Sequence, residues 1–215
     1  MVEMETLFQN RSAILREART TDWVPDHEFS VFNQMDHSFY DKHREAFVFK
    51  YRVFRAIAKV LKPATLTELG ACAGSGFDAY NAGADPLKFY FGYDVFPIVK
   101  HEDDGEDWDI YERAKLVLQK RGVDHKLIKA DLRSLASIEG ADLVCVDAGH
   151  LYRDAYRDMK LAFEARPMPK HIFVDDFVGD VRLAFDDIQS DHIENVADVV
   201  ELPYCCGGGL LVETV

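Results

Sequence analysis

Apolar and polar positions follow two alternating periods along most of the chain. Most of the short apolar, β-branched runs typical of buried strands are followed by a stretch whose apolar residues repeat at helical spacing. The runs are Thr65–Leu69, Lys88–Asp94, His125–Ala130, Ala141–Val146 and His171–Val174. Strands that are apolar on both faces need cover on both sides, so the pattern predicts a parallel sheet between two layers of helices.

Helical spacing is clearest over Asp41–Leu61, where Phe47, Phe54 and Ile57 fall on one face and Pro63 follows the last turn. Further helices are expected over residues 5–18, after the glycines that follow the first strand, around Tyr111–Leu118, over Asp154–Ala165 and over Asp180–Ile188. Two final strands, Val196–Leu202 and Leu210–Thr214, have no helix between them. They are therefore expected to form an antiparallel hairpin.

Composition narrows the class of protein. The chain has 215 residues, 48% of them hydrophobic and 29% charged, which is typical of one soluble globular domain. A formal net charge of −13 argues against nucleic acid as a partner. No apolar run approaches the ~20 residues of a membrane helix. The beginning of the sequence lacks a secretory apolar segment, and the four cysteines have no metal-ligand spacing, so a cytoplasmic protein with reduced thiols is expected.

The segment Thr20–Tyr40 is irregular and rich in aromatic residues. It is interpreted either as a lid over a pocket or as packing against the core. We therefore expect a single domain in which residues 1–43 form a helical, lid-like segment and residues 44–215 form the ligand-binding core.

Glycines follow the first strand at Gly70, Gly74 and Gly76. They predict a tight turn that lets a ligand approach the backbone at the start of a helix. Their spacing of 1, 5 and 7 differs from the dinucleotide fingerprint, and no lysine marks a phosphate-binding loop.

Acidic residues stand at the carboxyl end of almost every predicted strand: Glu68, Asp94, Asp131, Asp147, Asp175 and Asp176. In a doubly wound sheet, ligands bind outside these ends. An acid after the second strand is suited to accept hydrogen bonds from both ribose hydroxyls of a nucleoside.

The pattern E-x-G-x-x-x-G-x-G that begins at Glu68 resembles motif I of the class I S-adenosylmethionine (SAM) dependent methyltransferases. The resemblance implies a seven-stranded, doubly wound, mostly parallel Rossmann-like α/β sheet with an antiparallel C-terminal hairpin. It also implies that Asp94 binds the ribose of SAM and that Asp131 and Leu132 meet its adenine. The residues implied to hold the methionine part are Glu68, Gly70, Ala71, Gly74 and Gly76.

A second resemblance lies in VDAGHLYRDAYRDM and in the later FVDDF. Both are similar to motifs of a metal-dependent O-methyltransferase family that includes the macrolide-sugar O-methyltransferases and a cephalosporin-biosynthesis homologue. The fourth and fifth strands are expected to be neighbours, so Asp147, Asp175 and Asp176 can converge on Mg²⁺, or on Mn²⁺ as second choice. The alternative is that Asp175 caps a turn and that only Asp147 is functional.

His150 follows Asp147 by three residues. A buried structural histidine is the ordinary interpretation, but an imidazole beside a cation is also suited to act as a general base. The resemblance places the general base of the family at His150. Asp147 and His150 are therefore the expected catalytic residues.

The leading hypothesis is a SAM-dependent, divalent-metal-assisted O-methyltransferase acting on a small hydroxylated metabolite, a sugar or a phenol. The alternatives are a nucleotide (NAD)-binding oxidoreductase and a catalytically silent SAM-binding module. A homo-oligomer is possible, and neither nucleic acid nor a membrane is expected as a partner.

Overall fold

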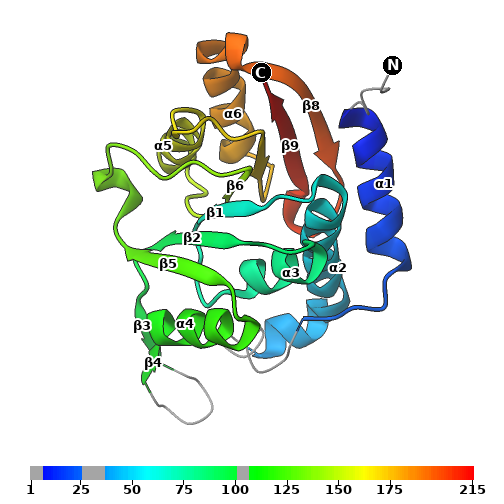
Figure 1. Ribbon diagram of the computed structural model, residues 1–215, viewed down its shortest axis with the longest axis vertical. Helices are drawn as coiled ribbons and strands as arrows, with labels where there is room; N and C mark the ends of the chain where they lie inside the picture. The colour runs from blue at the N-terminus through cyan, green and yellow to red at the C-terminus, as the bar shows by residue number, and fades with distance from the viewer. Residues whose placement is uncertain (1–6, 26–36, 101–106) are drawn as a thin grey trace.

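The computed structural model describes residues 7–25, 37–100 and 107–215. Its centre is a seven-stranded sheet in the order β5-β2-β1-β6-β7-β9-β8 (Figure 1). The strands of this sheet are β1 (Thr65–Leu69), β2 (Phe89–Asp94), β5 (Asp124–Lys129), β6 (Leu143–Val146), β7 (His171–Val174), β8 (Val196–Leu202) and β9 (Gly209–Thr214). The first five of these strands pair in parallel, and β9 runs antiparallel to both β7 and β8. The predicted parallel sheet and closing hairpin are confirmed.

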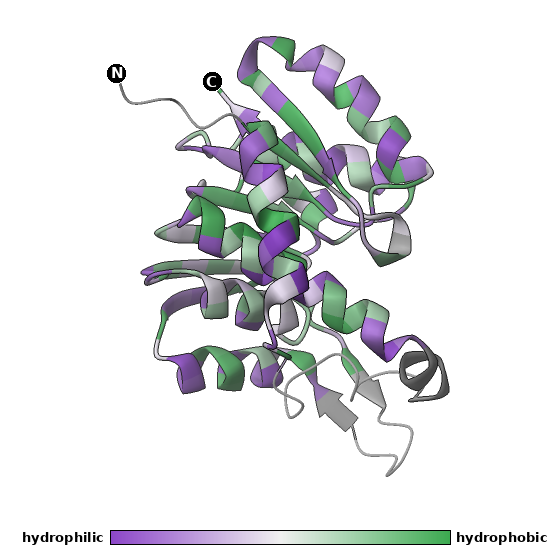
Figure 2. Cartoon of the chain, turned by 90° about the vertical axis from the view of Figure 1, so that its right-hand side faces the viewer, coloured by the Kyte–Doolittle hydropathy of each residue, from purple (hydrophilic) through white to green (hydrophobic). Residues whose placement is uncertain are grey.

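Helices cover both faces of the sheet (Figure 1). They are α1 (Leu7–Thr20), α2 (His37–Leu61), α3 (Ser75–Gly83), α4 (Ile110–Arg121), α5 (Tyr152–Phe163) and α6 (Asp180–Asp191). Short 3₁₀ turns lie at η2 (Leu132–Ser134), η3 (Ile193–Asn195) and η4 (Cys205–Gly207). Hydrophilic and hydrophobic residues are interspersed along the helices, as expected for elements with one buried face (Figure 2). No described helix is long and apolar enough to cross a membrane.

A small two-stranded sheet, β3 (Ile98–Lys100) with β4 (Asp107–Asp109), was not expected from the sequence. Strands of three residues offer too few positions for an alternating pattern to be visible.

The N-terminal helix α1 belongs to the packed body of the protein. Leu7, Ile14 and Ala18 are fully buried in the core, and Arg11 Nε donates a hydrogen bond to the Glu201 carbonyl at 2.7 Å. The aromatic segment interpreted as a lid falls largely on residues 26–36, which lie outside the described residues.

Alternate residues of each central strand face opposite helix layers. In β6, Leu143 and Cys145 join the core beneath α1 to α4, whereas Val144 and Val146 join the core beneath α5 and α6. Both faces of β6 are therefore apolar because helices cover both, as the sequence pattern predicted.

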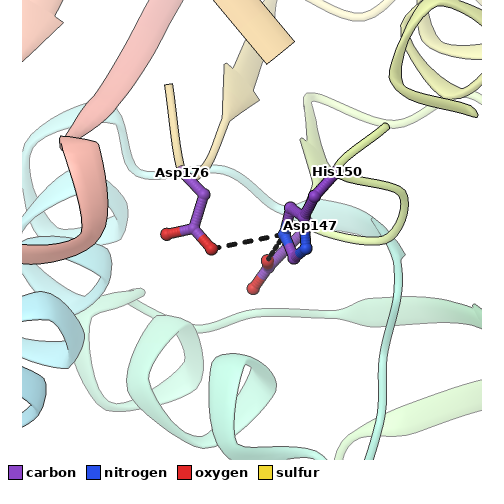
Figure 3. Close-up of side chains that lie close together, drawn as sticks. All are labelled: Asp147, His150 and Asp176. Carbon is purple, nitrogen blue, oxygen red and sulfur yellow. Dashed lines mark ion pairs between the residues drawn. The ribbon is translucent and has the colours of Figure 1, made fainter. Parts of the chain in front are cut away.

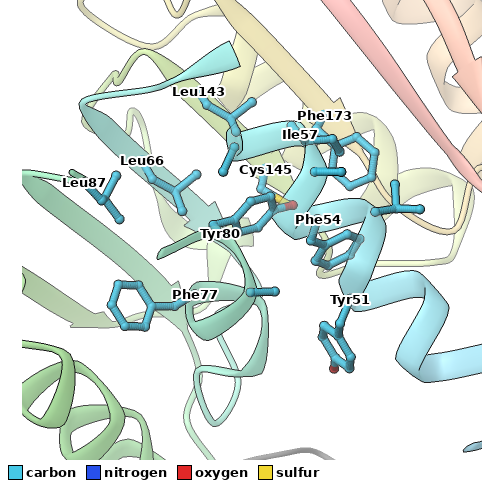
Figure 4. Packing of buried hydrophobic residues seen from close by; sticks show 14 of the residues in the cluster. Tyr51, Phe54, Ile57, Leu66, Phe77, Tyr80, Leu87, Leu143, Cys145 and Phe173 are labelled. Atoms are coloured by element: carbon cyan, nitrogen blue, oxygen red, sulfur yellow. The ribbon is translucent and has the colours of Figure 1, made fainter. Parts of the chain in front are cut away.

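Aromatic packing fixes α2 against the sheet (Figure 4). The Phe54 ring stacks on Tyr80 of α3, with centroids 5.1 Å apart, and meets Phe173 of β7 edge-on at 5.3 Å. Such pairs contribute about 0.5–1.5 kcal/mol each beyond their burial. These rigid side chains set the position of α2 relative to the ends of the strands. Lys50 lies one helical turn before Phe54 on α2, so its position is set by the same packing.

At Gly70, the chain leaves β1 in very close contact with the end of β6. Gly70 has φ +92°, and a Cβ added to it would lie 2.0 Å from the Asp147 carbonyl oxygen. Gly122, at the end of α4, has φ +67° but nothing within 4 Å of an added Cβ. The two glycines share the left-handed conformation and differ in the space around them.

We therefore expect Gly122→Ala to lower the free energy of unfolding by about 1–2 kcal/mol, the cost of a left-handed L residue. Gly70→Ala is expected to cost more, roughly 3 kcal/mol or above, because backbone must also move. Denaturant unfolding of both variants measures the difference. Equal losses would show that the approach of Gly70 to Asp147 is not tight.

Candidate active site at the carboxyl ends of the strands

A cavity of about 300 Å³ lies at the carboxyl ends of β1, β2, β5 and β6. This is where the strand order reverses, because β1 is paired with β2 on one side and with β6 on the other. The lining residues are Gly70, Cys72, Asp94, Val95, Ala130, Asp131, Leu132, Arg133, Asp147, Ala148, Gly149, Asp154 and Asp158. Five of them are aspartates, so the cavity disfavours polyanions.

The turn after β1 has the geometry that its glycines predict. Gly74 has φ +85° and is the N-cap residue of α3. A Cβ on Gly76 would lie 2.0 Å from Glu68 Oε1, so the buried carboxylate leaves no space for a larger residue there. Of the residues expected to hold the methionine part of SAM, only Gly70 lines the cavity; Ala71 is buried beside it.

Asp94 is held in a fixed orientation at the end of β2. Its Oδ2 accepts a hydrogen bond from the Cys72 amide at 2.8 Å, and its Oδ1 accepts one from the Phe96 amide at 2.9 Å. Each carboxylate oxygen has a second lone pair, so Asp94 can still accept from a ligand in the cavity.

Asp131 and Leu132 lie at the end of β5. Asp131 caps η2 by accepting from the Arg133 amide at 3.0 Å, and it also pairs with the Arg133 side chain at 2.7 Å. This side-chain hydrogen bond from Arg133 lowers the pKa of Asp131. Leu132 adds a largely buried apolar wall to the cavity.

Glu68 does not line the cavity. Its side chain is buried among the helices on the α3 side of the sheet and accepts a hydrogen bond from Tyr90 Oη at 2.5 Å. Burial raises the pKa of Glu68 to about 8, and the hydrogen bond from Tyr90 only partly offsets this effect. Glu68 therefore packs beneath the glycine turn, against Gly76.

Asp147, His150 and Asp176 form a cluster beside the cavity (Figure 3). His150 Nε2 lies 3.2 Å from Asp176 Oδ2 and 3.9 Å from Asp147 Oδ1. One ligand atom from each of the three residues lies within 4.8 Å of the others. Asp176 adopts φ +48°, a conformation that L residues rarely take outside functional or turn positions.

Asp175, expected as a metal ligand, is not one of the three residues of this cluster. Its carboxylate is fully buried, with Oδ2 in an ion pair with Lys50 Nζ and Oδ1 accepting a hydrogen bond from Tyr204 Oη. Both oxygens are thus engaged within the protein. The structure groups His150, rather than Asp175, with Asp147 and Asp176.

Lys50 of α2 was not identified from the sequence. Its Nζ also lies 3.6 Å from Asp176 Oδ1 and 3.9 Å from Asp147 Oδ2. The signal was weak, because Lys50 falls in the middle of an amphipathic helix more than 90 residues before its partners. Asp158, on α5, was also missed; it is buried and accepts from the Gly149 amide at 3.0 Å, which fixes the loop that carries His150.

The charged groups in and around the cluster shift one another's pKa values. Burial alone would lower the pKa of Lys50, but Asp147, Asp175 and Asp176 outweigh it and raise that pKa. Burial and the neighbouring Asp175 raise the pKa of Asp147. Burial also favours a higher pKa for Asp176, but the neighbouring His150 and Lys50 outweigh burial and lower the pKa of Asp176. The hydrogen bond between His150 and Asp176 raises the pKa of His150.

Comparison with known proteins finds similarity in structure only. No protein-family model matches the chain, and no curated protein matches it in sequence. The solved structure of the Podospora anserina methyltransferase PaMTH1 with SAH bound aligns with a TM-score of 0.55 at 15% identity, over 100% of this chain and 98% of that one. The O-methyltransferase TomG from Streptomyces achromogenes, involved in tomaymycin synthesis and solved with SAM, aligns with a TM-score of 0.55 at 14% identity, over 99% and 100%.

The chain has the class I methyltransferase fold. An O-methyltransferase from Bacillus cereus in complex with SAH aligns in the same way, with a TM-score of 0.52 at 11% identity over 100% of this chain and 93% of that one. The strand order and the antiparallel β9 of this methyltransferase fold confirm the architecture expected from the sequence.

Glu68 gives the methyltransferase fold a pH-dependent stability. Its pKa of about 8 in the folded protein exceeds its ordinary value of 4.5, so protonation of the Glu68 carboxyl stabilises the folded state relative to the unfolded state. That contribution is fully present below about pH 4.5 and is lost as the pH rises through about 8. Glu68→Gln keeps an acceptor for Tyr90 and carries no charge. As the pH rises from about 4.5 to about 8, its free energy of unfolding should therefore increase relative to that of wild type, by up to about 1.4 kcal/mol per pH unit.

Urea unfolding at several pH values between 5 and 9 measures this difference. Glu194→Gln, on an exposed turn, is the matched control and should track the wild type. A constant difference between Glu68→Gln and wild type would contradict the buried, proton-binding carboxyl.

Proposed function

We propose that the protein is a SAM-dependent methyltransferase that methylates a hydroxyl group of a small metabolite, with a divalent cation held beside the cavity. The observation that carries the proposal is the position of Asp147. It lines the cavity and also belongs to the cluster with His150 and Asp176. A methyl donor in the cavity would therefore lie next to an acceptor held at the cluster.

The cavity has features suited to SAM. Asp94 lies at the end of β2 with its carboxylate aimed by two backbone amides, where it can accept from ribose hydroxyls. Leu132 offers an apolar surface of the kind that an adenine needs, and Asp131 lies beside it. SAM carries a sulfonium cation and no phosphate, so a cavity lined by five aspartates favours it over a dinucleotide.

The cluster also fits a divalent cation. The carboxylates of Asp147 and Asp176 are suitable oxygen donors for Mg²⁺ or Mn²⁺, with water or substrate oxygen completing the sphere. Asp147 Oδ1 and Asp176 Oδ2 both face His150, so the two side chains present one carboxylate oxygen each on the same side. A cation bound there would lower the pKa of an acceptor hydroxyl and fix its orientation.

The remaining chemistry belongs to residues of this chain. Methyl transfer from a sulfonium is an in-line displacement, so the acceptor oxygen must be aligned and must lose its proton. His150 is half-exposed at the edge of the cluster, where its imidazole can take that proton as a general base. Asp176 holds the imidazole through Nε2, and Asp158 holds the loop beneath it.

Binding of SAM is the first test. Asp94→Ala should weaken SAM binding by about 1–3 kcal/mol, or 5- to 150-fold in Kd, because the ribose loses a charged acceptor. Asp124→Ala, at the opposite end of the sheet on β5, removes the same charge and should leave the Kd unchanged. Isothermal titration with SAM and with NADH measures both variants. Binding of NADH without SAM would favour the oxidoreductase alternative and contradict the proposal.

The role of His150 is tested by turnover. His150→Ala should lower kcat about 10²-fold at neutral pH, the usual contribution of a general base, while the Kd for SAM stays unchanged. His125→Ala, on the outer strand β5, removes a histidine away from the cavity and should keep wild-type kcat. A His150→Ala protein with wild-type kcat would assign this histidine a structural role.

A further inference from the structure

Lys50 is a buried lysine surrounded by carboxylates. Only 10% of its side chain is exposed, and its ammonium lies over the Phe54 ring, with Nζ 5.6 Å from the ring centroid. A buried ammonium group is costly unless acidic groups compensate it. Here Asp147, Asp175 and Asp176 all lie within 4.0 Å of Nζ.

The three carboxylates divide their oxygens between two sides. Asp175 is fully engaged by Lys50 and Tyr204. Asp147 and Asp176 each turn one oxygen toward Lys50 and the other toward His150. Lys50 thus lies on one side of this pair of carboxylates and His150 on the other.

We propose that Lys50 is the resident cation of this carboxylate cluster: its ammonium group holds Asp147 and Asp176 in place and weakens the binding of a divalent cation. The inference rests on the proposed function, since it assigns a positioning residue to the same site. Three carboxylates carry three formal negative charges, and Lys50 offsets one of them. A positive charge a few ångströms from a dication opposes its binding strongly in a partly buried site.

The geometry also specifies where a divalent cation can bind. Lys50 occupies the Asp175 side, so the oxygens that remain for a divalent cation are Asp147 Oδ1 and Asp176 Oδ2, on the side that faces His150. Asp175 then serves the site indirectly, by anchoring Lys50. Tyr204 supports the same arrangement, because its hydroxyl donates a hydrogen bond to Asp175 Oδ1 and so fixes the orientation of that carboxylate.

Titration calorimetry with Mg²⁺ on the full-length protein tests this role. Lys50→Met keeps most of the length of the side chain and its apolar character, and removes its charge. Its Kd for Mg²⁺ should be at least about 10-fold lower than that of wild type. Lys59→Met removes one charge from the same helix, but Lys59 is half-exposed and paired with Glu17, so its Kd should match that of wild type.

Thermal unfolding supplies a second readout that does not depend on turnover. In the presence of a chelator, Lys50→Met should unfold at a lower temperature than wild type, because three carboxylates face one another without a cation. Saturating Mg²⁺ should then raise its unfolding temperature more than it raises that of wild type or Lys59→Met. Equal Mg²⁺ affinities and equal thermal shifts in all three proteins would overturn the proposal.

Wild-type protein provides a test that holds even if Lys50→Met does not fold. The anomalous signal of crystals soaked in Mn²⁺ should place the ion against Asp147 and Asp176, on the side that faces His150, with Lys50 still paired with Asp175. An ion bound to Asp175 with Lys50 displaced would overturn the proposal. Titration of the same proteins with SAM keeps the two ideas separate: absence of SAM binding contradicts the methyltransferase function, whereas the Mg²⁺ and Mn²⁺ results decide the role of Lys50.

Discussion

Mutual repulsion among carboxylates is the constraint on which the site depends. A parallel sheet gathers the ends of its strands at one edge, and here β6 and β7 deliver Asp147, Asp175 and Asp176 to adjacent positions. Such a group is unstable without compensating positive charge. Lys50 provides that charge from α2, and α2 is in turn fixed by the packing of Phe54 against α3 and β7. The aromatic core and the charged site are therefore parts of one arrangement.

The same edge of the sheet explains why the cavity and the cluster are adjacent. Gly70 lets the turn after β1 pass directly over the end of β6, which brings the cavity up to Asp147. The loop after Asp147 is held by Asp158 from α5, so His150 is presented from a supported segment. Under the proposed function, the cavity and the cluster on the two sides of Asp147 would hold the methyl donor and the acceptor.

Much of this organisation could be predicted from the sequence, because it depends on local patterns. The strands Thr65–Leu69, His171–Val174 and Val196–Leu202 have the bounds expected from their apolar runs. Acids at strand ends were predictable for the same reason, since a turn follows each run. The partners of those acids were not predictable, because the pairing of Lys50 with Asp175 joins residues far apart in sequence and depends on how α2 packs. Glu68 shows the converse: its motif position suggested a ligand contact, but strand alternation turns its side chain beneath the glycine turn.

The central claim is that the cavity binds SAM with its reactive end toward the cluster. A crystal structure of the protein with S-adenosylhomocysteine tests this most directly. The account predicts the ribose against Asp94, the adenine beside Leu132 and the sulfur on the side of Asp147 that faces His150. Density for the ligand outside this cavity, or with its sulfur turned away from Asp147, would contradict it.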